Sequence, residues 1–116
     1  MLFKKEACAK TTVRTQNKLM HPKTLDDVYA SLGILFNDPE EFIVLTLEDS
    51  KVKHGIQYIQ SAWTADGLTV QAGVEENGMI RLVEKYISLF ECEKIYKKFF
   101  ETSEVDNIKE YTEVQF

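Results

Sequence analysis

Two histidines and two cysteines are the most chemically capable side chains in this sequence, and their spacing predicts no catalytic site. His21 precedes Pro22, and His54 lies in the polar run Lys-Val-Lys-His-Gly. A catalytic histidine needs an orienting carboxylate and a nucleophile within hydrogen-bond reach, and no motif places either group beside these residues. Cys8 and Cys92 form neither a CxxC nor a Cys/His ligand spacing, so we interpret them as buried, reduced thiols in preference to a disulfide or a zinc site.

Paired acids are the next candidates, because carboxylates can hold a metal ion. Glu48-Asp49 and Glu75-Glu76 both fall at the ends of predicted strands. A metal site would need further oxygen ligands to converge on such a pair, so we interpret these acids as solvated turn residues. The five glycines have neither a GxGxxG nor a P-loop spacing. The sequence therefore predicts a protein without catalytic residues, metal or cofactor.

The composition is typical of one soluble domain that spans residues 1–116. Apolar residues make up 44% of the chain and charged residues 28%, which is ordinary for a globular protein. The longest apolar run is far shorter than the roughly 18 residues of a membrane-spanning helix. The start, Met1 to Glu6, has basic residues but no apolar segment behind them, so we expect no secretory signal and a cytoplasmic protein.

Charge is distributed unevenly along the chain. Residues 1–24 carry six basic groups and one acid, a net charge of +5, and the remainder carries 14 − 6 = 8 basic groups and 19 − 1 = 18 acids, a net charge of −10. An acidic body repels nucleic acid and membrane phosphates and attracts basic partners, although solvated surface acids would give the same composition. The basic start either pairs with the acidic body or marks a small anion-binding strand.

Residues 56–87 read as three consecutive antiparallel strands, and they organise the predicted fold. The turns are Thr64-Ala65-Asp66-Gly67 and Glu75-Glu76-Asn77-Gly78, the second of which suits the positive φ of a tight hairpin. Side chains alternate between the two faces of a strand. In the first strand, one face would carry Ile56, Tyr58, Gln60 and Ala62, and the other face Gln57, Ile59, Ser61 and Trp63.

One helix is expected before these strands in the sequence and a second one after them. Thr24 caps a helix with the apolar stripe Leu25, Val28, Tyr29 and Leu32, and Gly33 is a plausible stop. Ser88 and Glu91 form a capping box that opens the second helix. Its predicted buried stripe is Leu89, Cys92, Ile95, Tyr96 and Phe99.

The other strands are predicted from weaker signals. The run 42–47 is continuously apolar, which favours a central strand buried on both faces over a buried helix. Residues 8–20 and 111–116 are candidate edge strands. The predicted fold is α+β, a mostly antiparallel sheet of five to six strands in the order β-α-β-β-β-β-α-β, with two helices packed on one face and the other face partly open.

The open sheet face is where a binding surface is expected. Gln57, Gln60, Thr69 and Gln71 suit a hydrogen-bonding sheet surface, and Trp63 would be either part of the core or a contact anchor. The predicted partner-binding residues combine two aromatic anchors with acids of the three strands and their turns: Tyr58, Trp63, Asp66, Glu75, Glu76 and Glu84.

Several segments together resemble small bacterial immunity proteins of polymorphic-toxin systems. They lie within residues 23–102 and are Lys23–Val28, Phe42–Leu45, Tyr58–Gln60, Val74-Glu75, Ser88 and Ile95–Phe100. The resemblance implies a cytoplasmic protein that binds a cognate toxin domain, basic and acting on nucleic acid, and blocks it without chemistry of its own. It carries over no individual residue and does not account for the basic start. The alternative is a small homodimeric or ligand-binding domain with a regulatory role.

Overall fold

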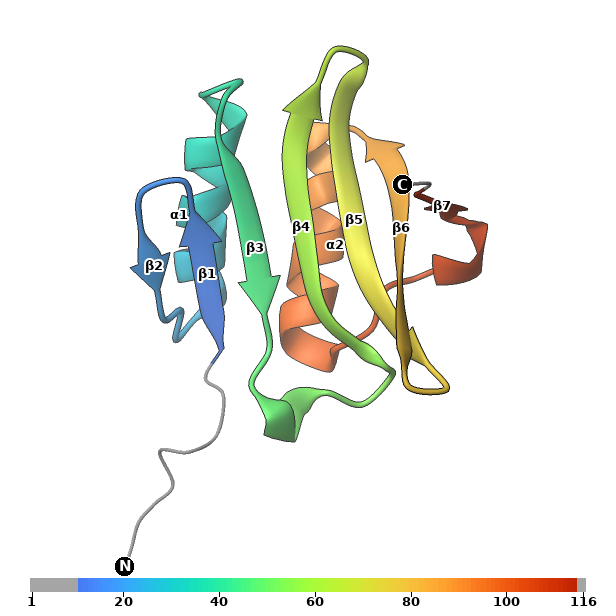
Figure 1. The fold of residues 1–116 in the computed structure, drawn as a ribbon. Coiled ribbons are helices and arrows are strands. Elements are labelled where there is room, and N and C mark those ends of the chain that lie inside the picture. Colours follow the sequence, from blue (N-terminus) through green and yellow to red (C-terminus); the bar gives the residue numbers. More distant parts are fainter. Residues whose placement is uncertain (1–10, 115–116) are drawn as a thin grey trace, which may run out of the picture.

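A seven-stranded antiparallel sheet forms the centre of the structure, a computed structural model that describes residues 11–114. The spatial order is β2-β1-β3-β4-β5-β6-β7, and Figure 1 shows both helices on one face of the sheet. The fold is therefore α+β with one uncovered sheet face, as predicted, with seven strands in place of five or six. The strands are β1 (Thr12–Thr15), β2 (Leu19–Met20), β3 (Phe42–Thr46), β4 (Ile56–Thr64), β5 (Gly67–Glu76), β6 (Met79–Ile87) and β7 (Thr112–Glu113).

The central meander β4-β5-β6 is confirmed with its predicted turns. Asn77 and Gly78 have φ values of 54° and 80°, the left-handed conformation that a two-residue hairpin requires. One detail differs from the expected alternation. The register between β4 and β5 shifts between Ile56 and Tyr58, and this bulge allows Ile56 to be buried although Tyr58 lies on the uncovered face.

The first predicted strand is in fact a hairpin, which accounts for the additional strand. Residues 8–10 lie outside the described residues; beyond them β1 turns back at Gln16–Lys18 to form β2. The amide of Thr15 donates to the carbonyl of Lys18, and the buried carboxylate of Glu41 accepts a 2.7 Å hydrogen bond from the amide of Gln16. β1 is consequently an interior strand, and this edge of the sheet is β2. The other edge is β7, which is shorter than the predicted strand 111–116, of which residues 115–116 lie outside the described residues.

The prediction that the 42–47 strand is buried on both faces is wrong. β3 lies inside the sheet between β1 and β4, and its Ile43 and Leu45 are completely buried under the helices. The side chain of Phe42 is 36% exposed and Val44 is half-buried, because no second layer covers their face. The apolar run therefore marks an interior strand with an uncovered apolar face.

Helix α1 (Leu25–Phe36) begins as predicted and ends later. Thr24 and Asp27 form a reciprocal capping box, and backbone hydrogen bonds from Lys23 and Thr24 lower the pKa of the Asp27 carboxyl. Gly33 does not stop the helix, because one more turn buries Leu35 completely.

Helix α2 (Leu89–Thr102) begins at the predicted Ser88–Glu91 capping box. Cys92, Tyr96 and Phe99 of the predicted stripe are buried, and Ile95 packs partly against the core. Leu89 is an exception, 44% exposed, because it is the first helical residue. No helix in the described part of the chain is long and apolar enough to cross a membrane.

Candidate functional site

The uncovered side of the sheet is the candidate binding surface. We call it the open face, and its centre consists of Phe42 and Val44 of β3, Tyr58, Gln60 and Ala62 of β4, Thr69, Gln71 and Gly73 of β5, and Leu82, Glu84 and Tyr86 of β6. Thr46 of β3 and the exposed Arg14 of β1 lie on the same face toward the β1 side. The strand register arranges these residues in three rows that cross the sheet. Two rows are largely apolar and the row between them is polar.

The polar row is a hydrogen-bonded ladder with a fixed direction. Gln60 Nε2 donates to Gln71 Oε1 at 2.6 Å, and Gln71 Nε2 donates to Glu84 Oε1 at 2.9 Å. A carboxylate oxygen can only accept, so the amide nitrogen of Gln71 must face Glu84. The amide oxygen of Gln71 then faces Gln60, which must donate through its own amide nitrogen. Three side chains from three strands are thereby held in one line across the open face.

A shallow recess lies next to the ladder. Its volume is about 280 Å³, and Phe42, Val44 and Ala62 provide its apolar lining, with Thr69 and the two glutamines on its polar side. The row across this recess reads Phe42, Ala62, Thr69, Tyr86, so two small residues lie between two aromatic ones. Such a recess can accept an apolar side chain of a partner next to hydrogen-bonding groups.

On the other side of the ladder, Tyr58 lies flat across the sheet. Its ring contacts the backbone of Gly73, where a side chain would collide with the ring. Gly73 pairs with Leu82 of β6, so Tyr58 and Leu82 form a continuous apolar strip.

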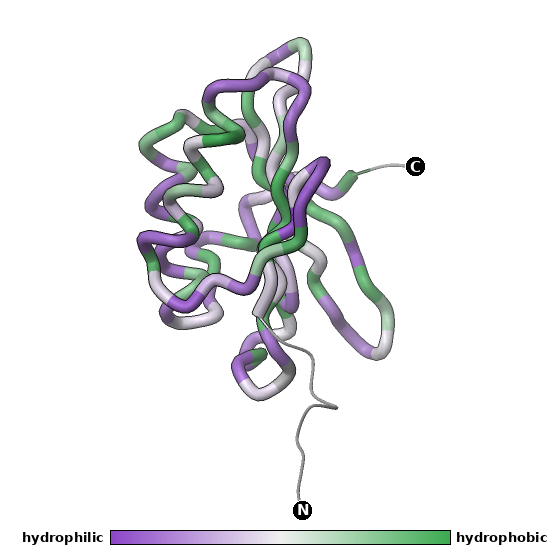
Figure 2. The backbone as a smooth tube through the Cα atoms, turned by 90° about the vertical axis from the view of Figure 1, so that its left-hand side faces the viewer, coloured by the Kyte–Doolittle hydropathy of each residue, from purple (hydrophilic) through white to green (hydrophobic). Residues whose placement is uncertain are grey.

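The strip continues into the exposed end of the β5-β6 hairpin. Met79 and Ile80 are 73% and 64% exposed, and the acids Glu75 and Glu76 lie opposite them. The last pair between β5 and β4 is Val74 with Ile56, and the amide of Glu75 donates to the carbonyl of Gly55 at 2.8 Å; beyond Glu75 the hairpin has no β4 neighbour. Figure 2 shows this end of the hairpin bending away from the helices, which curves the open face at this corner.

The structure brings together only some of the predicted partner-binding residues. Tyr58 and the half-buried Glu84 lie on the open face, and Glu75 lies at its curved corner. Asp66 is at the opposite end of the ten-residue strand β5, about 30 Å away at the usual rise per residue.

The two remaining predicted residues are Glu76, which lies beside Glu75 and pairs with Arg81, and Trp63, which belongs to the helix side. It is half-buried against the core, and its indole Nε1 donates a 2.8 Å hydrogen bond to the carbonyl of Leu35 at the end of α1. Of the two alternatives for Trp63, the structure thus favours the core edge. Trp63 and Tyr58 lie on opposite faces of the sheet.

Comparisons of this chain with protein-family models, with curated proteins and with solved structures find no match. The geometry of the described residues is therefore the basis for assigning the site.

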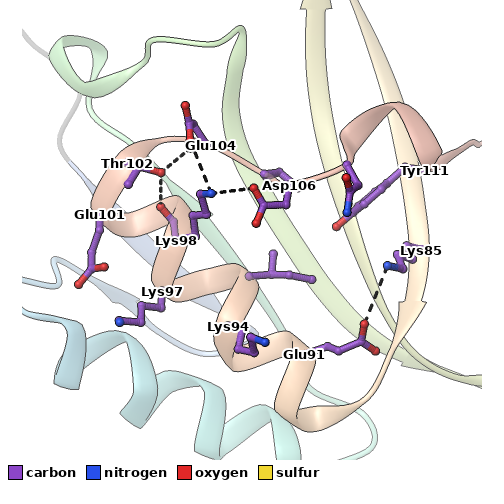
Figure 3. Close-up of a pocket in the computed structure, with 13 residues that line it drawn as sticks. Lys85, Glu91, Lys94, Lys97, Lys98, Glu101, Thr102, Glu104, Asp106 and Tyr111 are labelled. Carbon is purple, nitrogen blue, oxygen red and sulfur yellow. Dashed lines mark hydrogen bonds and ion pairs between the residues drawn. The ribbon is translucent and has the colours of Figure 1, made fainter.

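A second concave region lies between α2, the segment 104–107 and β6, with a volume of about 570 Å³ (Figure 3). Its charged groups largely neutralise one another. Lys98 Nζ lies 2.7 Å from Asp106 Oδ1 and 3.8 Å from Glu104 Oε1, and Lys85 Nζ lies 3.9 Å from Glu91 Oε2. The hydrogen bond to Asp106 raises the pKa of Lys98. The lining holds four lysines and four acids, and several of them are already paired, so the cleft is less suited to a charged ligand than its residue types suggest.

Two of the residues with catalytic potential, His54 and Cys92, are engaged in structural contacts, whereas Cys8 lies outside the described residues. His54 Nε2 lies 3.1 Å from Glu104 Oε2, an ion-pair geometry between two half-exposed side chains that joins the β3-β4 loop to the segment after α2. Burial raises the pKa of the Cys92 thiol to about 12, so it stays protonated at neutral pH. Among residues 11–114 no three His, Cys, Asp or Glu side chains form a group that could hold a metal ion.

Sequence reasoning overlooked part of this surface. Phe42 and Val44 were expected to be covered, and no signal singled out Met79 or Ile80. The ladder was foreseeable: once the two turns fix the register, Gln60, Gln71 and Glu84 occupy one row on the same face.

Proposed function

We propose that this chain is a non-enzymatic protein-binding module that holds a basic partner domain on its open face. The observation that carries the proposal is the continuous surface from the recess at Phe42 through Tyr58 and Leu82 to Ile80. Most soluble domains cover such apolar area or use it for binding. The hydrogen-bonded ladder supports the same role, because it presents ordered polar groups between the apolar rows at little further entropic cost.

Electrostatics supports a basic partner. The chain has a net charge of −5, and Glu75, Glu76 and Glu84 lie on or beside the proposed surface. Complementary charge accelerates encounter and selects among partners, whereas buried apolar anchors determine how long the complex lasts. The acids and the apolar strip therefore have separate roles in one binding event.

The sequence resemblance supplies a class for this partner. If the chain is an immunity protein, the partner is a toxin domain that acts on nucleic acid, because such domains carry basic clefts for their substrates. An acidic surface with an exposed hairpin end is suited to occupy a cleft of that kind. The inhibition then needs only occupancy, in keeping with a protein that performs no reaction.

Co-expression tests this function. The proposal expects a neighbouring gene to encode a secreted protein with a C-terminal toxin domain, and this domain is expressed in a bacterial host with and without the chain. The parent chain should restore growth, and Ile80→Asp should lose most of the protection, because a charge would have to be buried in the contact. The matched control is Phe90→Asp, which changes an equally exposed apolar residue on α2.

Growth restored by Ile80→Asp but not by Phe90→Asp would place the partner on the helix side and overturn the assignment of the open face. A stable dimer of the purified chain that cannot bind the toxin domain would favour the alternative, in which the same face pairs with a second copy.

A further inference from the structure

Glu84 is the acid nearest the centre of the open face, and its carboxylate has a fixed orientation. It is half-buried, and Oε1 accepts the 2.9 Å hydrogen bond from Gln71. Gln71 is itself fixed by Gln60. A carboxylate that is oriented by a chain of amides is a preorganised acceptor, because little side-chain freedom remains to be lost on binding.

This carboxylate has no cationic partner among the described residues. The ion pairs of β6 involve its two other charged side chains, Arg81 with Glu76 and Glu113, and Lys85 with Glu91. Alternation places both cations on the helix side of the strand, away from Glu84. A half-buried carboxylate without a counter-charge can still receive one from a ligand through a charge-assisted hydrogen bond.

The neighbours of Glu84 define which cation would fit. On the same strand and the same face, Leu82 precedes it and Tyr86 follows it, and Tyr86 is 49% exposed. These two side chains offer apolar surface for the aliphatic stem of a long basic residue, while the carboxylate receives its charged head.

We infer that the Gln60–Gln71–Glu84 ladder is a receptor for an arginine side chain of the partner. Arginine fits better than lysine, because the planar guanidinium has five donors in a fixed fork and is more weakly hydrated than an ammonium. Oε2, to which no described residue donates, and the second lone pair of Oε1 together accept such a fork. This inference rests on the proposed function and adds to it the chemistry of one contact.

An NMR titration of the whole chain tests the inference directly. The probe is N-acetyl-arginine amide, and the side-chain amide signals of Gln60 and Gln71 are the readout. We expect saturable shifts of these signals, whereas N-acetyl-citrulline amide, the uncharged isostere, should give none. Glu84→Gln keeps the shape of the ladder and removes the charge. It should lower the affinity for the arginine probe by about fivefold, the scale of one partly exposed ion pair.

The matched variant is Glu110→Gln, which removes an exposed acid outside the open face and should bind the probe like the parent. Equal shifts with the arginine and citrulline probes, or equal affinity in Glu84→Gln and the parent, would overturn the inference. The toxin domain then separates the two proposals. If Ile80→Asp abolishes toxin binding while Glu84→Gln leaves both toxin and probe binding unchanged, the arginine receptor is wrong and the proposed function stands. If neither variant affects toxin binding, both are wrong.

Discussion

The ring of Tyr58 lies so close to Gly73 that a Cβ atom at residue 73 would be 2.5 Å from the ring Cζ. Residue 73 must be glycine because the Tyr58 ring leaves no room for a side chain. Backbone conformation does not require the glycine, since its φ is outside the left-handed region. An aromatic ring packed over a glycine on the neighbouring strand restores the side-chain contact that the glycine lacks. This pair also shapes the open face, because the ring stays flat and continues the apolar strip toward Leu82.

Gly73→Ala should therefore displace the Tyr58 ring and cost about 1–2 kcal/mol of unfolding free energy, the scale of overpacking. Denaturant unfolding and the NMR signals of the Tyr58 ring measure the two effects. Gly33→Ala is the matched control: it lies within α1 with nothing within 4 Å of the added atom, so it should stabilise the protein by up to about 1 kcal/mol. An unchanged ring signal in Gly73→Ala would show that the contact is loose.

Ser88→Ala should lower the unfolding free energy by about 1 kcal/mol, the usual scale of an N-cap. The Ser88 hydroxyl accepts from the amide of Glu91 at 3.1 Å, and the Glu91 carboxylate accepts from the amide of Ser88 at 3.2 Å. Ser88→Thr, which keeps the hydroxyl, should recover most of the loss. A denaturation midpoint equal to that of the parent in Ser88→Ala would contradict a helix start at this residue.

Turn and capping residues in the sequence correctly predicted the parts of the fold that depend on a few neighbouring residues. The Asn77-Gly78 turn and the Ser88 cap are confirmed, since backbone conformation and capping depend on a few neighbouring residues. Gly33 shows the limit of such signals. Its weak helix propensity costs about 1 kcal/mol, and burial of Leu35 one turn later outweighs it.

Long-range contacts explain what the sequence did not predict. The β1-β2 turn depends on Glu41, 25 residues away, whose carboxylate holds the amide of Gln16. The role of Trp63 likewise depends on a carbonyl 28 residues away. For the binding surface, alternation predicted which residues share a face, but exposure of Phe42 and Ile80 depends on whether a second layer covers that face, and no local pattern reports that.

Raising the pH should destabilise the protein through Cys92 and Tyr96. Burial raises the pKa of Cys92 from 9.0 to about 12 and that of Tyr96 well above 10. In the unfolded chain both groups lose their protons at lower pH, so the stability present below about pH 9 declines as the pH rises toward the folded-state values. Denaturant unfolding should show a loss of roughly 1 kcal/mol per pH unit, beginning at about pH 9 for Cys92 and at about pH 10 for Tyr96.

The control for this prediction is Cys92→Ala, which should have a shallower pH dependence than the parent despite lower stability at neutral pH. In a Cys8→Ser background, Cys92 should also react with a thiol reagent only on unfolding. Rapid reaction in the native protein at about pH 8 would contradict the burial of the thiol.

Hydrogen exchange should distinguish β3 from β2. The amides of Ile43 and Leu45 belong to a strand with neighbours on both sides and completely buried side chains, so they should exchange at rates set by global unfolding. Leu19 lies in a two-residue edge strand and is half-exposed, so its amide should exchange much faster. Fast exchange in β3 would contradict its place inside the sheet.

Charge reversal at Glu75 should slow association with the toxin domain and leave dissociation nearly unchanged. Glu75 is preferable to Glu76, because Glu76 Oε1 lies 3.0 Å from Arg81 Nε and its replacement would also disturb the hairpin. Long-range attraction acts on encounter, so Glu75→Lys should lower the association rate several-fold to about tenfold at low salt and weaken its salt dependence. The matched control for Glu75→Lys is Asp66→Lys, since it makes the same charge change at the other end of β5. Binding kinetics at two salt concentrations should show a clearly smaller effect for it. Equal effects in the two variants would mean that net charge, rather than docking near the hairpin end, governs association. Unchanged rates in both would move the contact to the α2 side, where Phe90 is exposed.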